Sequence, residues 1–119
     1  EWDLRSFRGD PKYEARKWEF KRYQLKAFER ILKSLEKDKI PIILVQAPVT
    51  KKLYNSYSNN KEVDSYYNSK GIYFNFNEIL GLSPCEYFYD EHHLNQNGVR
   101  VFNEELINLI RNSGLIIKN

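Results

Sequence analysis

The chain has no methionine, one cysteine and two histidines among its 119 residues, and it contains only five glycines and four prolines. Because Cys85 has no second cysteine to pair with, no disulfide can form within the chain. No apolar run reaches the roughly 20 residues that a membrane-spanning helix needs, and no signal peptide is recognisable. The abrupt start without methionine leads us to expect a piece of a longer protein, which leaves the compartment open.

An excess of charge of one sign is also missing. The 19 Lys and Arg residues exceed the 16 Asp and Glu residues by three, which gives a net charge of +3. Between Lys12 and Lys39 the two signs are interleaved, as they are on a solvated helix surface, and no basic stripe stands apart from the acids. We therefore expect no nucleic-acid binding. With 41% hydrophobic and 15% aromatic residues, the composition is that of one globular domain.

The hydrophobic pattern predicts alternating helices and strands. Residues 13–37 show the apolar spacing of a helix, with Tyr13 and Trp18 on its apolar stripe. The apolar run at 40–49 is typical of a strand buried on both faces of a parallel sheet. The other predicted elements are helical segments at 50–57 and 61–69, a strand at 72–76, a loop or helical turn at 77–86, and a helix from Asn97 with Val99, Phe102, Leu106, Leu109 and Ile110 as its core face. This order predicts an α/β fold.

The predicted sheet is thin for an α/β domain, because it has two clear strands and at most a short third one at 115–117. We therefore expect further strands to lie upstream in the parent protein. The predicted organisation is a single partial domain over residues 1–119. It comprises an irregular N-terminal segment at 1–12 and an α/β core at 13–114, which carries the loop at 85–98.

The stretch at 87–98 holds both histidines and is the candidate site. Asp90 precedes His93 by three residues, a spacing at which the carboxylate can accept a hydrogen bond from the near ring nitrogen. Such a bond fixes the imidazole tautomer and leaves the far nitrogen free to act as a base. A second interpretation is structural: Asp90 caps a turn, His93 packs beneath it, and Asn95 or Asn97 caps the last helix.

Two further interpretations involve Cys85. Together with Asp90, His92 and His93 it offers four metal-binding side chains close in sequence, but their spacing matches no familiar zinc pattern. Alternatively, Cys85 is a nucleophile paired with His93, although a small structural thiol is the commoner role of such a residue. The sequence leaves the roles of Cys85 and His92 open, and it predicts neither a metal nor a cofactor.

The residues from Asp90 to Gly98, followed by Phe102 and Leu106, resemble the last conserved block of the SGNH (GDSL-like) hydrolase superfamily. That block reads Asp-x-x-His and often continues as Leu-Asn-x-x-Gly into a helix. The resemblance covers residues 17–110 and is strongest to the branch of the DltD-like and alginate O-acetylation proteins, which acylate cell-envelope polymers. It implies the C-terminal portion of a flavodoxin-like, three-layer parallel sheet.

By the same resemblance, Asp90 is the orienting carboxylate and His93 the general base of a serine esterase or O-acyltransferase acting on acyl esters. An acyl-ester or carbohydrate substrate, such as a cell-envelope polysaccharide, follows from the analogy alone. So does an extracytoplasmic or envelope-associated location.

The serine nucleophile of this superfamily belongs to a Gly-Asp-Ser block that is absent here. Gly9 and Asp10 are followed by Pro11, which cannot act as a nucleophile, and neither Ser6 nor Ser83 has the matching context. The blocks that complete the oxyanion hole are absent too. We therefore expect the isolated chain to be inactive.

The alternative function is a non-catalytic α/β structural or interaction domain that retains the fold. In either case a thin sheet leaves an uncovered strand edge, which invites a partner strand. We expect that edge to pair with the missing N-terminal part of the protein or with a second copy of the chain.

Overall fold

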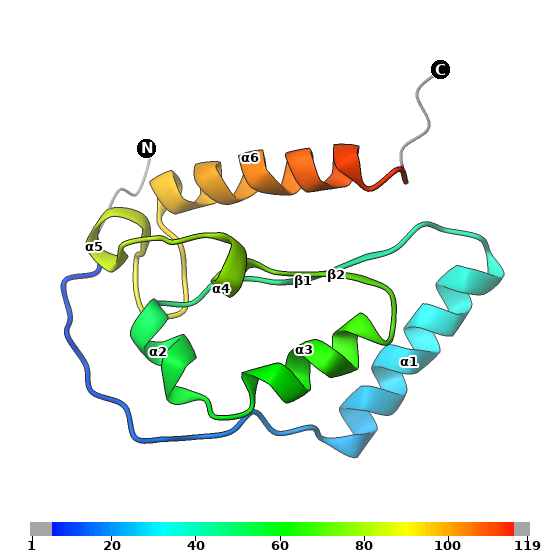
Figure 1. Ribbon diagram of the computed structural model, residues 1–119, viewed down its shortest axis with the longest axis horizontal. Helices are drawn as coiled ribbons and strands as arrows, with labels where there is room; N and C mark the ends of the chain where they lie inside the picture. The colour runs from blue at the N-terminus through cyan, green and yellow to red at the C-terminus, as the bar shows by residue number, and fades with distance from the viewer. Residues whose placement is uncertain (1–5, 116–119) are drawn as a thin grey trace.

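The computed structural model describes residues 6–115 of the chain. Helices alternate with two short strands along this part (Figure 1). The elements are α1 Arg22–Lys37, β1 Ile43–Gln46, α2 Lys51–Ser56, α3 Asn60–Asn68, β2 Ile72–Asn75, α4 Phe76–Ile79, α5 Pro84–Tyr87 and α6 Gln96–Asn112. No helix among the described residues is long and apolar enough to span a membrane.

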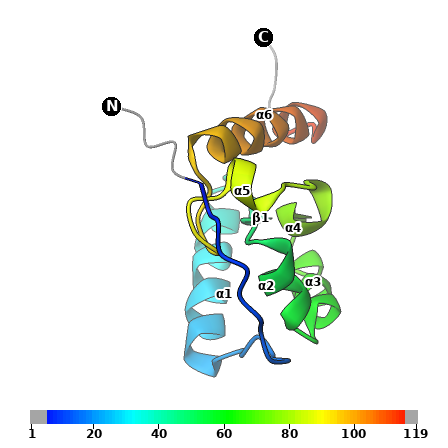
Figure 2. The same ribbon diagram turned by 90° about the vertical axis from the view of Figure 1, so that its left-hand side faces the viewer.

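The two strands form a parallel pair, with Ile43 opposite Ile72 and Gln46 opposite Asn75. Helix α6 lies on one side of this pair, and α2 and α3 lie on the other (Figures 1 and 2). The predicted mixed α/β fold with parallel strands is confirmed. The sheet has two strands among the described residues, and a three-layer flavodoxin-like sheet is not evident there.

The first helix is shorter than the sequence pattern predicts. It begins at Arg22, whereas residues 13–21 are extended and include a parallel bridge from Arg16 to Tyr57. The prediction of one helix over 13–37 was therefore wrong at its N-terminal end.

Trp18 explains why the segment before α1 is extended. Its backbone N–H donates to Asn59 Oδ1 at 2.8 Å, and Asn59 Nδ2 donates back to the Trp18 carbonyl at 3.0 Å. The indole N–H donates to Asn60 Oδ1 at 2.7 Å, and the ring stacks on Tyr57 at 3.7 Å between centroids. A helix would use the Trp18 backbone groups internally, so these contacts with distant residues override the helical pattern.

Strand β1 is shorter and less buried than predicted. It covers four of the residues in the apolar run, and the side chains of Ile40 and Val45 are 47% and 39% exposed. The expectation of a strand buried on both faces was wrong for the described residues, since none of the four side chains of β1 is fully buried. Val99 on α6 is likewise 38% exposed and does not belong to the core face that the sequence predicted. The expected strand at 115–117 lies largely outside the described residues.

A small apolar core lies around the ends of the strands. Phe76, Leu53 and Phe88 are at most 1% exposed, and the Phe76 ring lies 4.5 Å from that of Phe102 on α6. Phe76 directly follows β2, so this contact joins the carboxyl end of the sheet to the last helix.

A polar network lies on the opposite side, between β2 and α3. Buried Asn75 donates through Nδ2 to Asp64 Oδ1 and to the Tyr54 hydroxyl, each at 2.9 Å. The Tyr73 hydroxyl donates to the same Asp64 oxygen at 2.8 Å. Two effects raise the pKa of Tyr73 well above its ordinary value. The larger is burial, and the second is this hydrogen bond to the Asp64 carboxylate. The network holds α3 against the sheet, and its polar side chains are hydrogen-bonded to one another.

We expect Phe76→Ala to lower the free energy of unfolding by about 3–5 kcal/mol, because it removes a fully buried ring and leaves a cavity. Chemical denaturation measures the loss. Ile79→Ala is the matched control, since Ile79 lies on the same helix α4 but is 39% exposed. Equal losses for the two variants would contradict the placement of the core.

Candidate active site

The two histidines lie on a narrow loop between α5 and α6. At its base, Phe88 and Leu94 form an antiparallel bridge, and the N–H of Asn95 donates to the Tyr87 carbonyl at 2.9 Å. Further along, the N–H of Tyr89 donates to the His93 carbonyl at 2.8 Å. These bonds close residues 88–95 into a hairpin-like loop whose base is held by the buried Phe88 ring.

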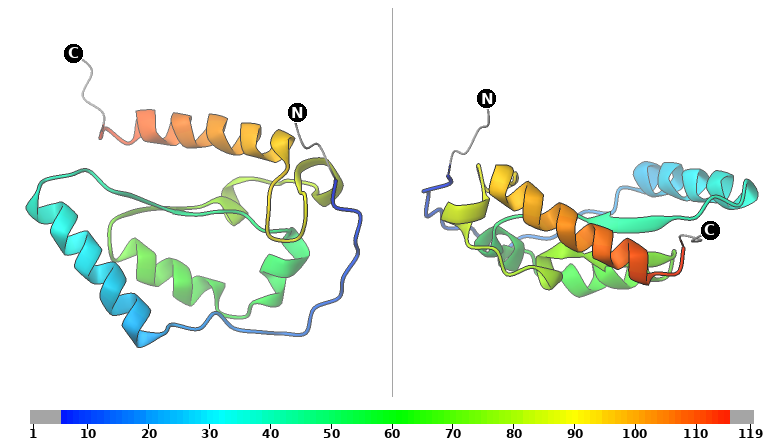
Figure 3. Two further views of the ribbon diagram at one scale, coloured as in Figure 1. Left: turned by 180° about the vertical axis from the view of Figure 1, so that it is seen from behind. Right: turned by 90° about the horizontal axis from the view of Figure 1, so that it is seen from above.

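The loop lies at the carboxyl edge of the parallel strands, beside α2 (Figure 3, left, yellow). The N–H of Thr50, just before α2, donates to the Glu91 carbonyl at 3.0 Å. The Tyr13 hydroxyl donates to the Glu91 carboxylate from the N-terminal segment. Burial and this bond to Glu91 raise the pKa of Tyr13 to about 12. Glu91 is therefore held from two directions, next to Asp90 in the chain.

The structure brings Asp90 and His93 together. His93 Nδ1 lies 2.9 Å from Asp90 Oδ1 and 3.0 Å from Oδ2, and the backbone N–H of His92 donates to Oδ1 at 2.8 Å. The predicted hydrogen bond is present. A neutral imidazole that donates from Nδ1 carries its lone pair on Nε2. Because the His93 side chain is 72% exposed, a reacting group can approach it from solvent.

The Asp90 carboxyl has a lowered pKa. Partial burial acts to raise it, but the hydrogen bonds from the His92 N–H and from His93 together lower it by more. Asp90 is therefore ionised at neutral pH, and its negative charge can stabilise a positively charged imidazole.

The side chains of the other residues that the sequence suggested take no part in the Asp90–His93 hydrogen bond. Cys85 is exposed on α5, and no hydrogen bond within the described part of the chain joins it to His93. The His92 ring is exposed, with its centroid 6.4 Å from that of His93. Ser83 donates to Glu86 at a long 3.4 Å. Over residues 6–115, no three His, Cys, Asp or Glu side chains are placed to hold a metal ion.

Asn95 connects α5, the loop and α6. Its side chain is buried, Oδ1 accepts from the N–H of Gly98 at 3.0 Å, and Nδ2 donates to the Glu86 carbonyl at 3.0 Å. The bond from the Gly98 N–H caps α6. The N-cap of this helix is therefore Asn95 and not Asn97. Gly98 is needed here for space, because a Cβ atom would lie 2.2 Å from the Tyr87 carbonyl oxygen.

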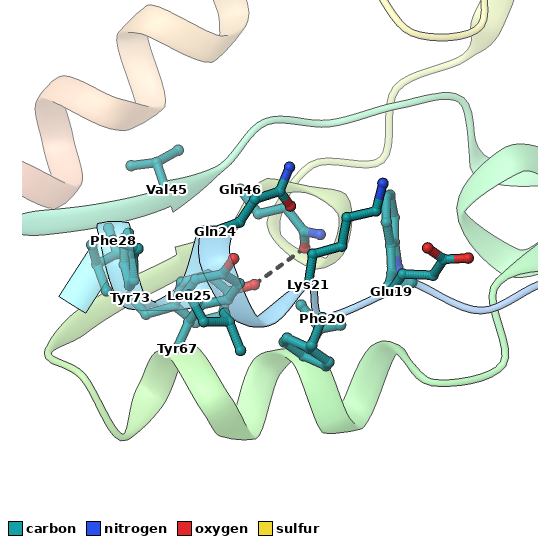
Figure 4. Close-up of a pocket in the computed structure, with 13 residues that line it drawn as sticks. Glu19, Phe20, Lys21, Gln24, Leu25, Phe28, Val45, Gln46, Tyr67 and Tyr73 are labelled. Carbon is teal, nitrogen blue, oxygen red and sulfur yellow. Dashed lines mark hydrogen bonds between the residues drawn. The ribbon is translucent and has the colours of Figure 1, made fainter. Parts of the chain in front are cut away.

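Sequence reasoning missed two clefts and the supports of the loop. One cleft, of about 450 Å³, lies among α2, α4 and α5. The other, of about 460 Å³, lies among α1, β1 and α3 and is rich in aromatic side chains, including Phe28, Tyr67 and Tyr73 (Figure 4). Tyr13 and Thr50 support the loop from positions far away in the chain, and no local pattern marks either contact.

Fold and site together define a mixed α/β protein with an exposed Asp–His pair at the carboxyl edge of parallel strands. Residues 11–114 match the model of an uncharacterised protein family, and the chain belongs to that family. No curated protein and no solved structure matches the chain.

We expect Gly98→Ala to lower the free energy of unfolding by about 1–3 kcal/mol, because the new methyl group overlaps the Tyr87 carbonyl and the Leu94 side chain. Denaturant titration measures this change. Gly81→Ala is the control: its Cβ meets nothing within 4 Å, and its φ is not positive. If Gly98→Ala leaves the free energy of unfolding unchanged, the junction of loop and helix has room for a methyl group and the close contact at Gly98 is wrong.

We expect His93→Ala to raise the pKa of Asp90 toward its ordinary value of 3.8, because one of the hydrogen bonds that lower it is lost. Carboxyl carbon NMR over a pH titration measures the shift. His92→Ala should leave this pKa in place, since residue 92 bonds Asp90 through its backbone N–H. Equal effects of the two variants would argue against a specific Asp90–His93 bond.

The same lowered pKa makes one contribution to the pH dependence of stability. Asp90 stabilises the fold above the unfolded-state pKa of about 4, and this contribution disappears as the pH falls through the lower folded-state pKa. We therefore expect the loss of stability in Asp90→Asn, compared with the wild type, to be present at pH 6 and to vanish at strongly acid pH. Thermal unfolding of both proteins across this range tests the sign.

Proposed function

We propose that this chain supplies the Asp–His half of the catalytic site of an SGNH-type serine esterase or O-acyltransferase. The observation that supports this most strongly is the bond of His93 Nδ1 to Asp90, with most of the imidazole exposed at the carboxyl edge of the strands. In open α/β sheets, ligands bind at that edge. The sequence resemblance assigns the same two residues the same roles.

The proposed chemistry needs a serine from outside residues 1–119. His93 Nε2 takes the proton of that hydroxyl as its oxygen attacks an ester carbonyl, and the ionised Asp90 stabilises the resulting imidazolium. His93 then returns the proton to the departing alcohol. The acyl group finally passes to water or to a sugar hydroxyl, with His93 acting again as the base.

The free edge of β1 offers a place for the serine-bearing part that the proposed enzyme needs. Within the described residues β1 pairs with β2 alone, and the segment Ile43–Gln46 carries no charge that would discourage a further strand. We place the remaining strands of a three-layer, flavodoxin-like sheet there, contributed by the parent protein or by a second polypeptide. A second copy of this chain could pair at the same edge, but it brings no Gly-Asp-Ser block. The envelope location remains part of the same proposal.

The test compares this chain alone with the same chain joined to, or complexed with, a segment that carries the Gly-Asp-Ser block. We expect no reaction of the chain alone with a fluorophosphonate probe or with p-nitrophenyl acetate. In the complete protein, His93→Ala should reduce ester hydrolysis by about 10⁶-fold, as loss of the histidine of a serine-protease triad does. His92→Ala is the matched control and should retain the activity.

Two results would overturn the proposal. One is full activity in His93→Ala. The other is a native partner or parent protein that binds the chain but carries no serine reactive with the probe. The second result would favour a non-catalytic interaction domain.

A further inference from the structure

The cleft among α2, α4 and α5 occupies the expected place for a ligand. Pro48 and Val49 follow β1 and line it, and Asn77 lines it just after β2. The cleft therefore lies outside the carboxyl ends of both parallel strands, where open α/β sheets bind ligands. Its volume of about 450 Å³ falls within the range of small-molecule sites.

About half of the residues that line the cleft are apolar, and the polar or charged ones are Lys51, Tyr54, Asn55, Asn77, Glu78 and Ser83. The apolar lining residues are Pro48, Val49, Leu80, Leu82, Pro84 and Phe88. The amide of Asn77 is already engaged, because Oδ1 accepts from the Val49 N–H at 2.8 Å and Nδ2 donates to Asn75 Oδ1 at 3.1 Å. The Tyr54 hydroxyl accepts from Asn75. Polar groups with partners inside the protein gain little from binding a polar ligand.

The cleft and the histidine loop share supporting residues. Phe88 lines the cleft and also pairs with Leu94, the residue after His93. Lys51 lines the cleft and follows Thr50, whose N–H holds the Glu91 carbonyl. An apolar chain in the cleft therefore lies at the same edge of the sheet as the Asp90–His93 pair.

We infer that this cleft is the acyl subsite and binds a short, straight hydrocarbon acyl chain. The inference rests on the proposed function for the identity of the ligand as an ester. It assigns the selectivity for acyl chain length to the segment between α4 and α5, which contributes Leu80 and Leu82.

The experiment titrates the full chain with neutral methyl esters, from methyl acetate to methyl hexanoate, and follows backbone amide shifts by NMR. Each added methylene that enters an apolar cleft should raise the affinity about three- to four-fold. The largest shifts should fall on Leu80, Leu82 and Phe88. Leu82→Asn should flatten the dependence on chain length, and Leu80→Asn is a second variant in case the first does not fold.

Leu25→Asn is the matched control, because Leu25 is half-buried like Leu82 but lines the aromatic cleft of Figure 4. It should leave the ester series unchanged. Equal affinity for all esters, or shifts that centre on Tyr67 and Tyr73, would overturn the inference. Ester binding needs no serine, so this result is independent of whether the complete protein proves to be an esterase.

Discussion

The parallel pairing of β1 with β2 is the constraint on which the rest of the structure depends. Parallel strands need a crossover connection, and here α2 and α3 provide it. The pairing also directs both strands toward one edge, so the segments that follow Gln46 and Asn75 emerge together. The histidine loop reaches that edge through the bond between the Thr50 N–H and the Glu91 carbonyl, and the acyl cleft proposed above opens beside it.

The site combines a rigid base with an exposed functional group. Phe88 and Asn95 are buried at the base of the loop and satisfy its backbone, whereas the imidazole of His93 extends into solvent. This arrangement orients a base without enclosing a substrate. A catalytic site built on it needs other walls, which agrees with a sheet that has an unpaired edge in the part of the chain described.

Local features were predictable because they depend on neighbours in the chain. The hydrogen bond of Asp90 to His93 joins residues three apart, and the cap of Asn95 on Gly98 has the same separation. The strand at 72–75 and the helix that starts at 96 followed from periodicity and turn residues. The extended conformation of residues 13–21 did not, because partners about 40 residues away impose it on a sequence with helical spacing.

The sequence by itself determined the mixed α/β class, the order of most elements and the two residues of the candidate site. Each of these is encoded within a window of a few residues, through periodicity, capping and short spacing. Only the tertiary structure decided how far β1 and α6 are buried, how Tyr13 and Thr50 hold the histidine loop, and where the clefts lie. These features depend on contacts between segments distant in the chain, and the free energy of such contacts is set by which surfaces meet in the fold.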